Sequence, residues 1–134
     1  MNIDLGNAEV RAAILCEQVR PEIGNKMTVV GVFSADIMVP SFPATFLLSV
    51  YMELTIKTLG HTHYQVRFTS PTDTPAEAVL DLQASFDELG GSAVPMPQIP
   101  VTCERPGQLK IEIRVVDQIW HDLIVREVVA APSA

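Results

Sequence analysis

Basic residues are scarce in this sequence. Nine Lys and Arg stand against sixteen Asp and Glu, so the formal net charge of the 134 residues is −7. Proteins that bind nucleic acids neutralise several phosphates at once, and anionic membranes recruit proteins through clusters of roughly four or more basic residues. The sequence contains no run of Lys or Arg. We therefore expect neither a nucleic-acid partner nor a membrane partner.

Long apolar runs and an export signal are missing as well. The longest apolar stretches, such as FLLSVYMEL, fall far short of the ~20 residues that cross a bilayer as a helix. A secretory signal begins with a positively charged segment, whereas this sequence places Asp4 and Glu9 there. The sequence therefore predicts a soluble, cytoplasmic protein.

Motifs for cofactors and metals are also lacking. Cys16 and Cys103 are the only cysteines, and neither has a second Cys or a His at the spacing of a zinc or CxxC site. The sequence has no GxxxxGK or GxGxxG phosphate loop and no DxD pair for calcium. We expect two buried, reduced thiols, with a disulfide as the alternative if the protein is exported. We expect no cofactor and no bound metal.

What the sequence does contain is a two-residue alternation of apolar and polar side chains. Every second residue from Phe46 to Ile56 is apolar, and the same holds from Tyr64 to Phe68. This alternation is typical of strands that bury one face. Because Gly60 lies between the two segments, we expect an antiparallel hairpin that turns there.

A second hairpin is predicted near the C-terminus. Residues 109–115 alternate in the same way, with Leu109, Ile111 and Ile113 on the apolar side. After the segment DQIWHD, the β-branched residues between Leu123 and Val129 predict the returning strand.

The front of the sequence predicts a third hairpin. Val10–Val19 and Met27–Ser34 flank the segment EIGN, in which Gly and Asn tolerate the positive φ of a tight turn. A helix that begins at Asn7 is the alternative for the first of these segments, and we favour the strand. In the second strand both faces are largely apolar. We expect Met27, Val29 and Phe33 to face the core, and Val30 and Val32 to face outward and need cover.

The segment from 75 to 89 fits two structures. Thr74, Pro75 and Glu77 resemble the start of a capped helix, and a Gly pair follows the segment. Against a helix, apolar residues such as Leu80 and Leu82 alternate with polar ones. We favour a strand and keep the helix as the alternative.

These segments predict one all-β domain spanning residues 1–134, with an ordered core from about 8 to 130. The sequence is 48% apolar, and its prolines and glycines fall mainly between the alternating segments, so neither a linker nor a repeat divides the chain. Several short strands with one apolar face each bury that face best as two packed sheets. We expect an antiparallel β-sandwich of about seven or eight strands, immunoglobulin-like or C2-like in outline.

The segments LCEQVR, GVFSADI and VPSFPAT, with RPGQLKIEIRVVDQIWHDLIV later, resemble a family of small bacterial proteins catalogued as a domain of unknown function. The resemblance runs from about Ala12 to Val129. The unit from Pro106 to Val125 is also similar to the final hairpin of immunoglobulin-like modules, although the Trp that antibody domains place between their two cysteines is absent. The resemblance implies a fold and no catalytic residues.

The three histidines offer the main alternative to a binding role. His61 and His63 stand two residues apart on a predicted strand, so both rings would leave one face about 7 Å apart. His121 lies beside Asp122 in a turn, and no GxSxG nucleophile elbow occurs. The alternative function is therefore a small hydrolase or metal-dependent enzyme that uses His61, His63 or His121 at the loop ends. Convergence of two of them with a carboxylate in a cleft would favour it.

Apolar residues in proline-rich connections form the preferred candidate site. SADIMVPSFPATF and VPMPQIPV hold Met, Phe and Ile among prolines, which keep the chain extended and out of sheet ladders. These residues either cap the open ends of the sandwich or anchor an interface. We expect a non-catalytic protein-binding, scaffolding or assembly module whose partner is another protein or a second copy. The candidate interaction residues are Val30, Val32, Ile37, Met38, Val39, Phe42, Met96, Ile99 and Trp120.

Overall fold

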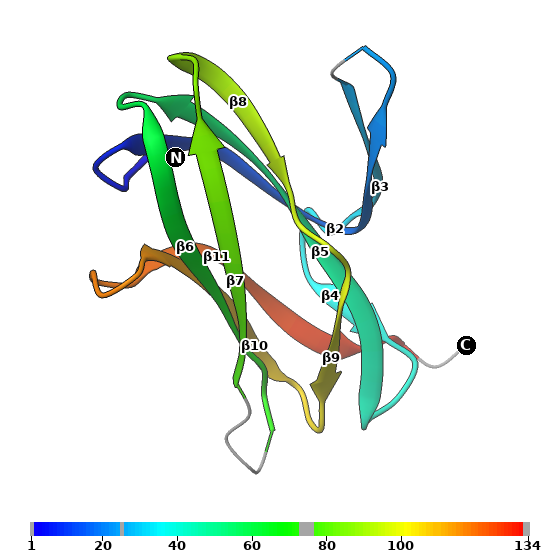
Figure 1. Cartoon of the computed structure of the whole chain (residues 1–134). Helices are drawn as coiled ribbons and strands as arrows, with labels where there is room; N and C mark the ends of the chain where they lie inside the picture. The colour runs from blue at the N-terminus through cyan, green and yellow to red at the C-terminus, as the bar shows by residue number, and fades with distance from the viewer. Residues whose placement is uncertain (1, 25, 73–76, 133–134) are drawn as a thin grey trace.

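The structure, a computed structural model, describes residues 2–24, 26–72 and 77–132. Every helix or strand assigned in these ranges is a strand, and eleven strands form two curled sheets (Figure 1). The all-β prediction is confirmed. The strands outnumber the seven or eight predicted because short ones, which alternation cannot detect, join the long ones. Within the described part of the chain, no helix is long and apolar enough to cross a membrane.

The first sheet is built around two long strands that each change neighbour part-way. Its six strands are β1 (Ile3–Asp4), β2 (Ala8–Glu22), β3 (Lys26–Val32), β5 (Ala44–Ile56), β8 (Gly90–Pro95) and β9 (Ile99–Cys103). The first part of β2 pairs antiparallel with β5, and the remainder pairs with β3. On its other side, β5 pairs with β9 near its start and with β8 near its end.

The second sheet has five strands in a single row. In spatial order these are β4 (Ile37–Val39), β11 (His121–Ala130), β10 (Gly107–Val115), β6 (Gly60–Thr69) and β7 (Glu77–Phe86). All pairs are antiparallel except β4 with β11, which is parallel.

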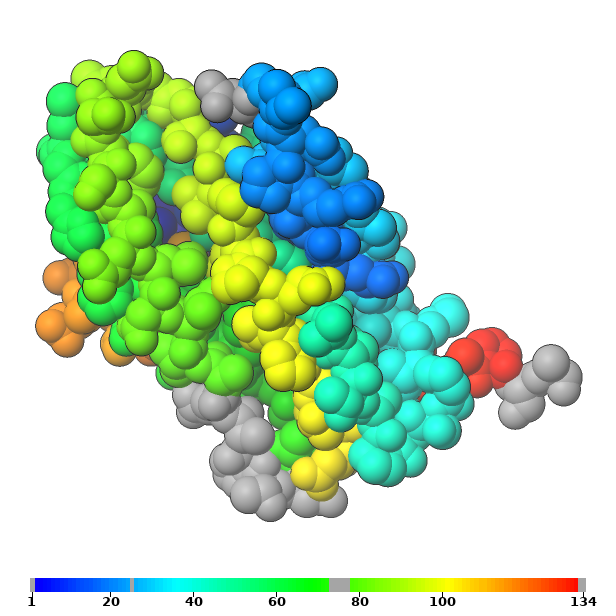
Figure 2. Space-filling model, turned by 45° about the vertical axis from the view of Figure 1, so that its right-hand side comes forward, coloured from blue at the N-terminus to red at the C-terminus, as the bar shows by residue number. Residues whose placement is uncertain are grey.

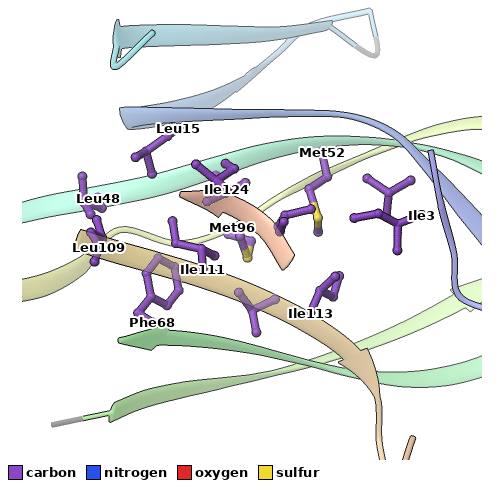
Figure 3. Close-up of a cluster of buried hydrophobic side chains, with 14 of the residues drawn as sticks. Ile3, Leu15, Leu48, Met52, Phe68, Met96, Leu109, Ile111, Ile113 and Ile124 are labelled. Atoms are coloured by element: carbon purple, nitrogen blue, oxygen red, sulfur yellow. The ribbon is translucent and has the colours of Figure 1, made fainter. Parts of the chain in front are cut away.

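The core lies between the two sheets, as the alternation predicts. Figure 3 shows Leu48 and Met52 of β5 on one side and Ile111 of β10 on the other, with their side chains directed into the same buried cluster. Each of these three side chains is at most 2% exposed. Burial of such side chains stabilises the fold by roughly 1.5–3 kcal/mol each. The predicted inward faces of the strands that begin near Phe46, Tyr64 and Leu109 are therefore confirmed.

Two of the three predicted hairpins are confirmed, and one is wrong. β2 and β3 form a hairpin across EIGN, and β10 and β11 form the C-terminal hairpin. The chain turns near Gly60, but β5 and β6 lie in different sheets. Two consecutive strands that each carry one apolar face can pair side by side or face each other across a core, and alternation specifies faces rather than neighbours.

The two segments with a helical alternative are both strands. Residues 8–22 form β2, and residues 77–86 form β7, which pairs with β6 along its whole length. In β7, alternate apolar residues such as Leu80 and Leu82 pack against the core. Thr74 and Pro75, which signalled a helix start, lie outside the described residues.

Candidate functional site

A two-stranded arm projects from the body of the protein. It comprises residues 17–32, that is, the second part of β2, the turn and β3, and we call it the β2–β3 arm. It follows Cys16, which pairs with Ser49 of β5 and also with Val32 of β3. Beyond this point β2 leaves β5, and the arm extends away from the other strands of the first sheet (Figure 1). The arm is drawn in blue in this view.

Three hydrogen bonds, two of them buried, lie at the point where the arm leaves the sheet. The Cys16 thiol donates to the Ser49 carbonyl oxygen at 3.5 Å, and the Ser49 hydroxyl donates to the Met96 carbonyl oxygen at 2.6 Å. The Gln98 side-chain amide donates to the Glu17 carbonyl oxygen at 2.8 Å. Burial raises the pKa of the Cys16 thiol. The base of the arm is thus held by the connection between β8 and β9.

The two faces of the arm differ in polarity. Val19 lies opposite Val29 and Pro21 lies opposite Met27, so one face is apolar. The other face carries mainly polar and charged residues. At the tip, Ile23 is 95% exposed. Contrary to expectation, Met27 and Val29 do not join the buried core, because the second sheet does not extend beneath the arm; Phe33 at its base does pack against the core.

Gly31 gives β3 a bend near the base of the arm. Its φ of 66° lies in the left-handed region, where a residue with a Cβ is strained. A Cβ at this position would also lie 2.6 Å from Oε1 of Glu17. The conformation therefore favours glycine here, and a larger residue would also displace the exposed Glu17 side chain.

A groove of about 430 Å³ lies at the base of the arm. Met38 and Leu47 on its rim are 63% and 49% exposed, and Val32 of the arm is 53% exposed. Figure 2 shows this side of the molecule, with the arm above the cyan segment that contains β4. Large apolar side chains are thus exposed along both the arm and the groove. The residues that line the groove are Glu17, Phe33, Ile37, Met38, Val39, Pro40, Ala44, Thr45, Phe46, Leu47 and Gln98.

The three histidines lie around a second hollow, a cavity of about 620 Å³ at one end of the sheets, which we call the end cavity. Asp4 also lines it. His61 contacts Ser85 at 3.3 Å and His63 contacts Asp81 at 3.0 Å, both on the neighbouring strand β7. Among the described residues, no group of three or more His, Cys, Asp and Glu is placed to hold a metal ion.

Several polar groups at the end cavity are already engaged within the chain. The backbone N–H of Gly6 and the Lys57 ammonium group hold the pKa of Asp4 below its ordinary value, and His121 acts in the same direction. Asn7 donates to the Thr62 hydroxyl, and the Tyr64 hydroxyl donates to Asn7 at 3.0 Å. Asp4, Asn7 and Thr62, which line the cavity, are therefore bonded within the chain.

Trp120 lies over the outer face of the second sheet, away from the arm. Its ring centroid is 4.2 Å from the guanidinium carbon of Arg67 and 4.3 Å from that of Arg114. Arg67 in turn donates to Glu112 at 2.8 Å. Cation–π contacts of this kind stabilise a fold by about 0.5–2 kcal/mol. Trp120 therefore has a structural role on this face.

Residues 11–126 match the model of a family of unknown function (DUF6941). The chain belongs to this family. The matched range includes the whole β2–β3 arm and every residue that lines the groove. A search of curated proteins finds no match to the chain. The resemblance to a family of unknown function is confirmed, and membership assigns no role to any residue.

The predicted interaction residues are divided between surface and core. Val32 and Met38 are exposed and Val30 is half-buried, all on the arm or the groove. Phe42 and Ile99 are half-buried and pack against the core. The side chains of Ile37, Val39 and Met96 are at most 5% exposed and lie in the core.

Two residues of this surface were not among the predicted ones. Leu47 alternates with the buried residues of β5, so it was detectable as an apolar residue on a solvent-facing position. Ile23 was detectable as a large apolar residue beside Gly24 in a turn. Both signals are local, whereas the burial of Ile37 and Val39 depends on pairing with the distant strand β11.

Proposed function

We propose that this protein is a non-catalytic binding or assembly module that holds another protein chain against the β2–β3 arm and the groove. The observation that carries the proposal is the arm itself, a two-stranded ribbon with one apolar face that stands away from the core. Isolated two-stranded hairpins are marginally stable in water. A second chain that covers the apolar face would stabilise the arm and would bury Ile23 and Met38.

The exposed area supports this proposal. The protein exposes 7516 Å², whereas a compact monomer of 14.6 kDa exposes about 6,900 Å². A projecting arm accounts for excess area of this kind.

Three further expectations belong to the same proposal. Two facing sheets support a β-sandwich, for which we propose the immunoglobulin-like or C2-like outline. Two free, buried cysteines and an acidic sequence support a cytoplasmic location. The family resemblance supports a bacterial origin.

Site-specific photo-cross-linking in the cells that produce the protein tests the proposal. A photoreactive residue replaces Met38 in one variant and Leu89, which is 64% exposed outside the arm and the groove, in the matched control. We expect an adduct of defined mass from position 38 and none from position 89. No adduct at position 38, or equal adducts at both positions, would contradict the proposal.

Binding of a small molecule at the end cavity is the second candidate function, with hydrolysis as its catalytic form. The observation that favours it is that His61, His63 and His121 line one cavity together with Asp4. Titration of the purified protein with a fragment library, followed through the histidine NMR signals, tests this candidate. Ligands that shift the His121 signal and compete with one another would support it, and an absence of such ligands would exclude it.

A further inference from the structure

One edge of β5 is left open where the β2–β3 arm leaves the first sheet. Along one side of β5, β9 pairs with residues 44–48 and β8 pairs with residues 51–56. Along the other side, β2 pairs with β5 from Ile56 back to Ser49 and then turns away. Within the described ranges, no strand takes the place of β2 beside residues 44–48. We call this stretch the open edge of β5, and the groove lies beside it.

Two prolines show which backbone groups of β5 point toward the open edge. In antiparallel strands, successive residues direct their N–H and C=O groups alternately toward and away from the neighbouring strand. Pro100 faces Leu47 and has no N–H, so this pair does not exchange hydrogen bonds. Pro95 likewise faces an odd-numbered residue of β5, whereas the carbonyl oxygen of Val50 accepts from the Met96 N–H at 3.2 Å. The odd-numbered residues of β5 therefore point away from β8 and β9.

The backbone N–H and C=O groups of Thr45 and Leu47 consequently face the groove, which both residues line. Among the described residues, nothing bonds to these four backbone groups, because the strand pairings and the other backbone hydrogen bonds leave them out. Beside them lies the apolar wall formed by Val39 and Phe46. Donors and acceptors that alternate along an apolar wall match the backbone of an extended chain.

We propose that the segment bound in the groove is an extended strand of a partner protein, which pairs antiparallel with residues 45–47 in the place that β2 leaves open. This inference rests on the proposed function and specifies the chemistry of the partner. One residue of the segment lies opposite Phe46 and points to the same side of the sheet. Its two neighbours exchange main-chain hydrogen bonds with Leu47 and Thr45.

The lining of the groove specifies the side chains of this segment. The residue opposite Phe46 is apolar, because Phe46 packs against the core and Val39 lies beside it. Glu17 is the only ionisable residue of the lining, and its carboxylate makes no ion pair within the described part of the chain. The nearby Arg126 already donates to the Phe33 carbonyl oxygen. Because Glu17 follows Cys16, where the open edge begins, the segment carries Lys or Arg at its N-terminal end.

Titration of the full chain with a short peptide, followed through the backbone amide NMR signals, tests the pairing. The probe is acetyl-Lys-Thr-Val-Thr-Val-amide, whose first Val is set opposite Phe46. We expect the amide signals of Thr45 and Leu47 to shift, and their hydrogen exchange to slow at least about tenfold at saturation. The signals of β3 should stay unchanged. No shift at Thr45 and Leu47, or shifts in β3 instead, would overturn the proposal. Shifts of these two amides that depend on protein concentration without peptide would assign the open edge to a second copy and would overturn it as well.

Two N-methylated forms of the peptide test whether the main chain forms the contact. Methylation at the first Thr removes the N–H that faces Leu47, whereas methylation at the first Val removes an N–H that points away from β5. The side chains are the same in both forms. We expect the first change to weaken binding at least about tenfold and the second to weaken it less than about threefold. Equal weakening by both changes would overturn the strand pairing.

Replacement of the peptide Lys by Glu tests the role of Glu17. We expect this change to weaken binding to the unaltered chain by about threefold and to strengthen binding to the variant Glu17→Lys. The same effect on both proteins would overturn the assignment of the basic residue to Glu17. An adduct from position 38 in cells, together with no peptide binding, would overturn the strand pairing while the proposed function stands. Absence of both would overturn both.

Discussion

Replacement of Gly31 by alanine tests the geometry that places the arm. At φ 66° an alanine costs about 1 kcal/mol relative to glycine. Its Cβ would also lie 2.6–2.8 Å from three side-chain atoms of Glu17, so that exposed side chain must leave its present rotamer, at a further cost of up to about 1 kcal/mol. Gly24→Ala is the matched control, because Gly24 has a φ of 86° but no atom within 4 Å of the added Cβ. We therefore expect up to about 2 kcal/mol of local destabilisation for Gly31→Ala and about 1 kcal/mol for Gly24→Ala.

Native-state hydrogen exchange is the assay for this prediction, because we expect an arm outside the core to open without unfolding the core. The opening free energy of the amides in β3 should fall by the two amounts given, while the amides of β10 should keep their protection. The double variant Glu17→Ala with Gly31→Ala removes the steric contact and should recover about half of the loss. Equal losses for Gly31→Ala and Gly24→Ala, or no recovery in the double variant, would refute the reasoning.

Three further predictions concern the body of the protein. Ile111→Ala should lower the free energy of unfolding by about 2–5 kcal/mol in urea titrations. Val125→Ala on the outer face should change the free energy of unfolding by less than about 0.5 kcal/mol. Similar values for both variants would contradict the assigned core. Trp120→Ala should lower the free energy of unfolding by about 1–2 kcal/mol, and Trp120→Phe should lower it by less, because phenylalanine retains a ring face for the two arginines. Equal losses in the two variants would rule out the cation–π contacts as the cause. Burial raises the pKa of Cys16 and Cys103, so the unfolded chain loses these protons first and stability falls as the pH rises from the ordinary thiol pKa through the raised values. Urea midpoints at about pH 7 and about pH 10 should show this decrease, and a chain with both cysteines replaced by alanine should show a smaller one.

The sequence predicted which residues are buried better than it predicted which strands are neighbours. Alternation along β5 identified Leu48 and Met52 as core residues, because a strand's two faces are a local property. It did not show that β5 and β6 separate into different sheets, because that depends on which apolar faces meet across the core. Thr74 and Pro75 favoured a helix, whereas the alternation in residues 77–86 favoured a strand. These residues form β7, which pairs with β6 along its whole length.

The candidate site was predicted in part for the same reason. The EIGN hairpin could be read locally, but its departure from the sheet depends on the absence of a facing strand beneath it. The pairing of β4 with β11 leaves Met38 exposed and buries its neighbours Ile37 and Val39. β4 has three residues and pairs with a segment about 90 residues away, so no local pattern shows which of its side chains are buried and which are exposed.

Methionine oxidation footprinting tests most directly whether another chain covers the arm and the groove. Met38 is 63% exposed at the groove and Met27 lies on the apolar face of the arm, whereas Met96 is 3% exposed and serves as the internal control. Brief oxidant treatment should modify Met38 rapidly in the dilute purified protein and several times more slowly in intact cells, with Met27 following the same trend and Met96 slow in both. Oxidation of Met38 at the same rate in both settings would contradict the assignment of this surface as an interface.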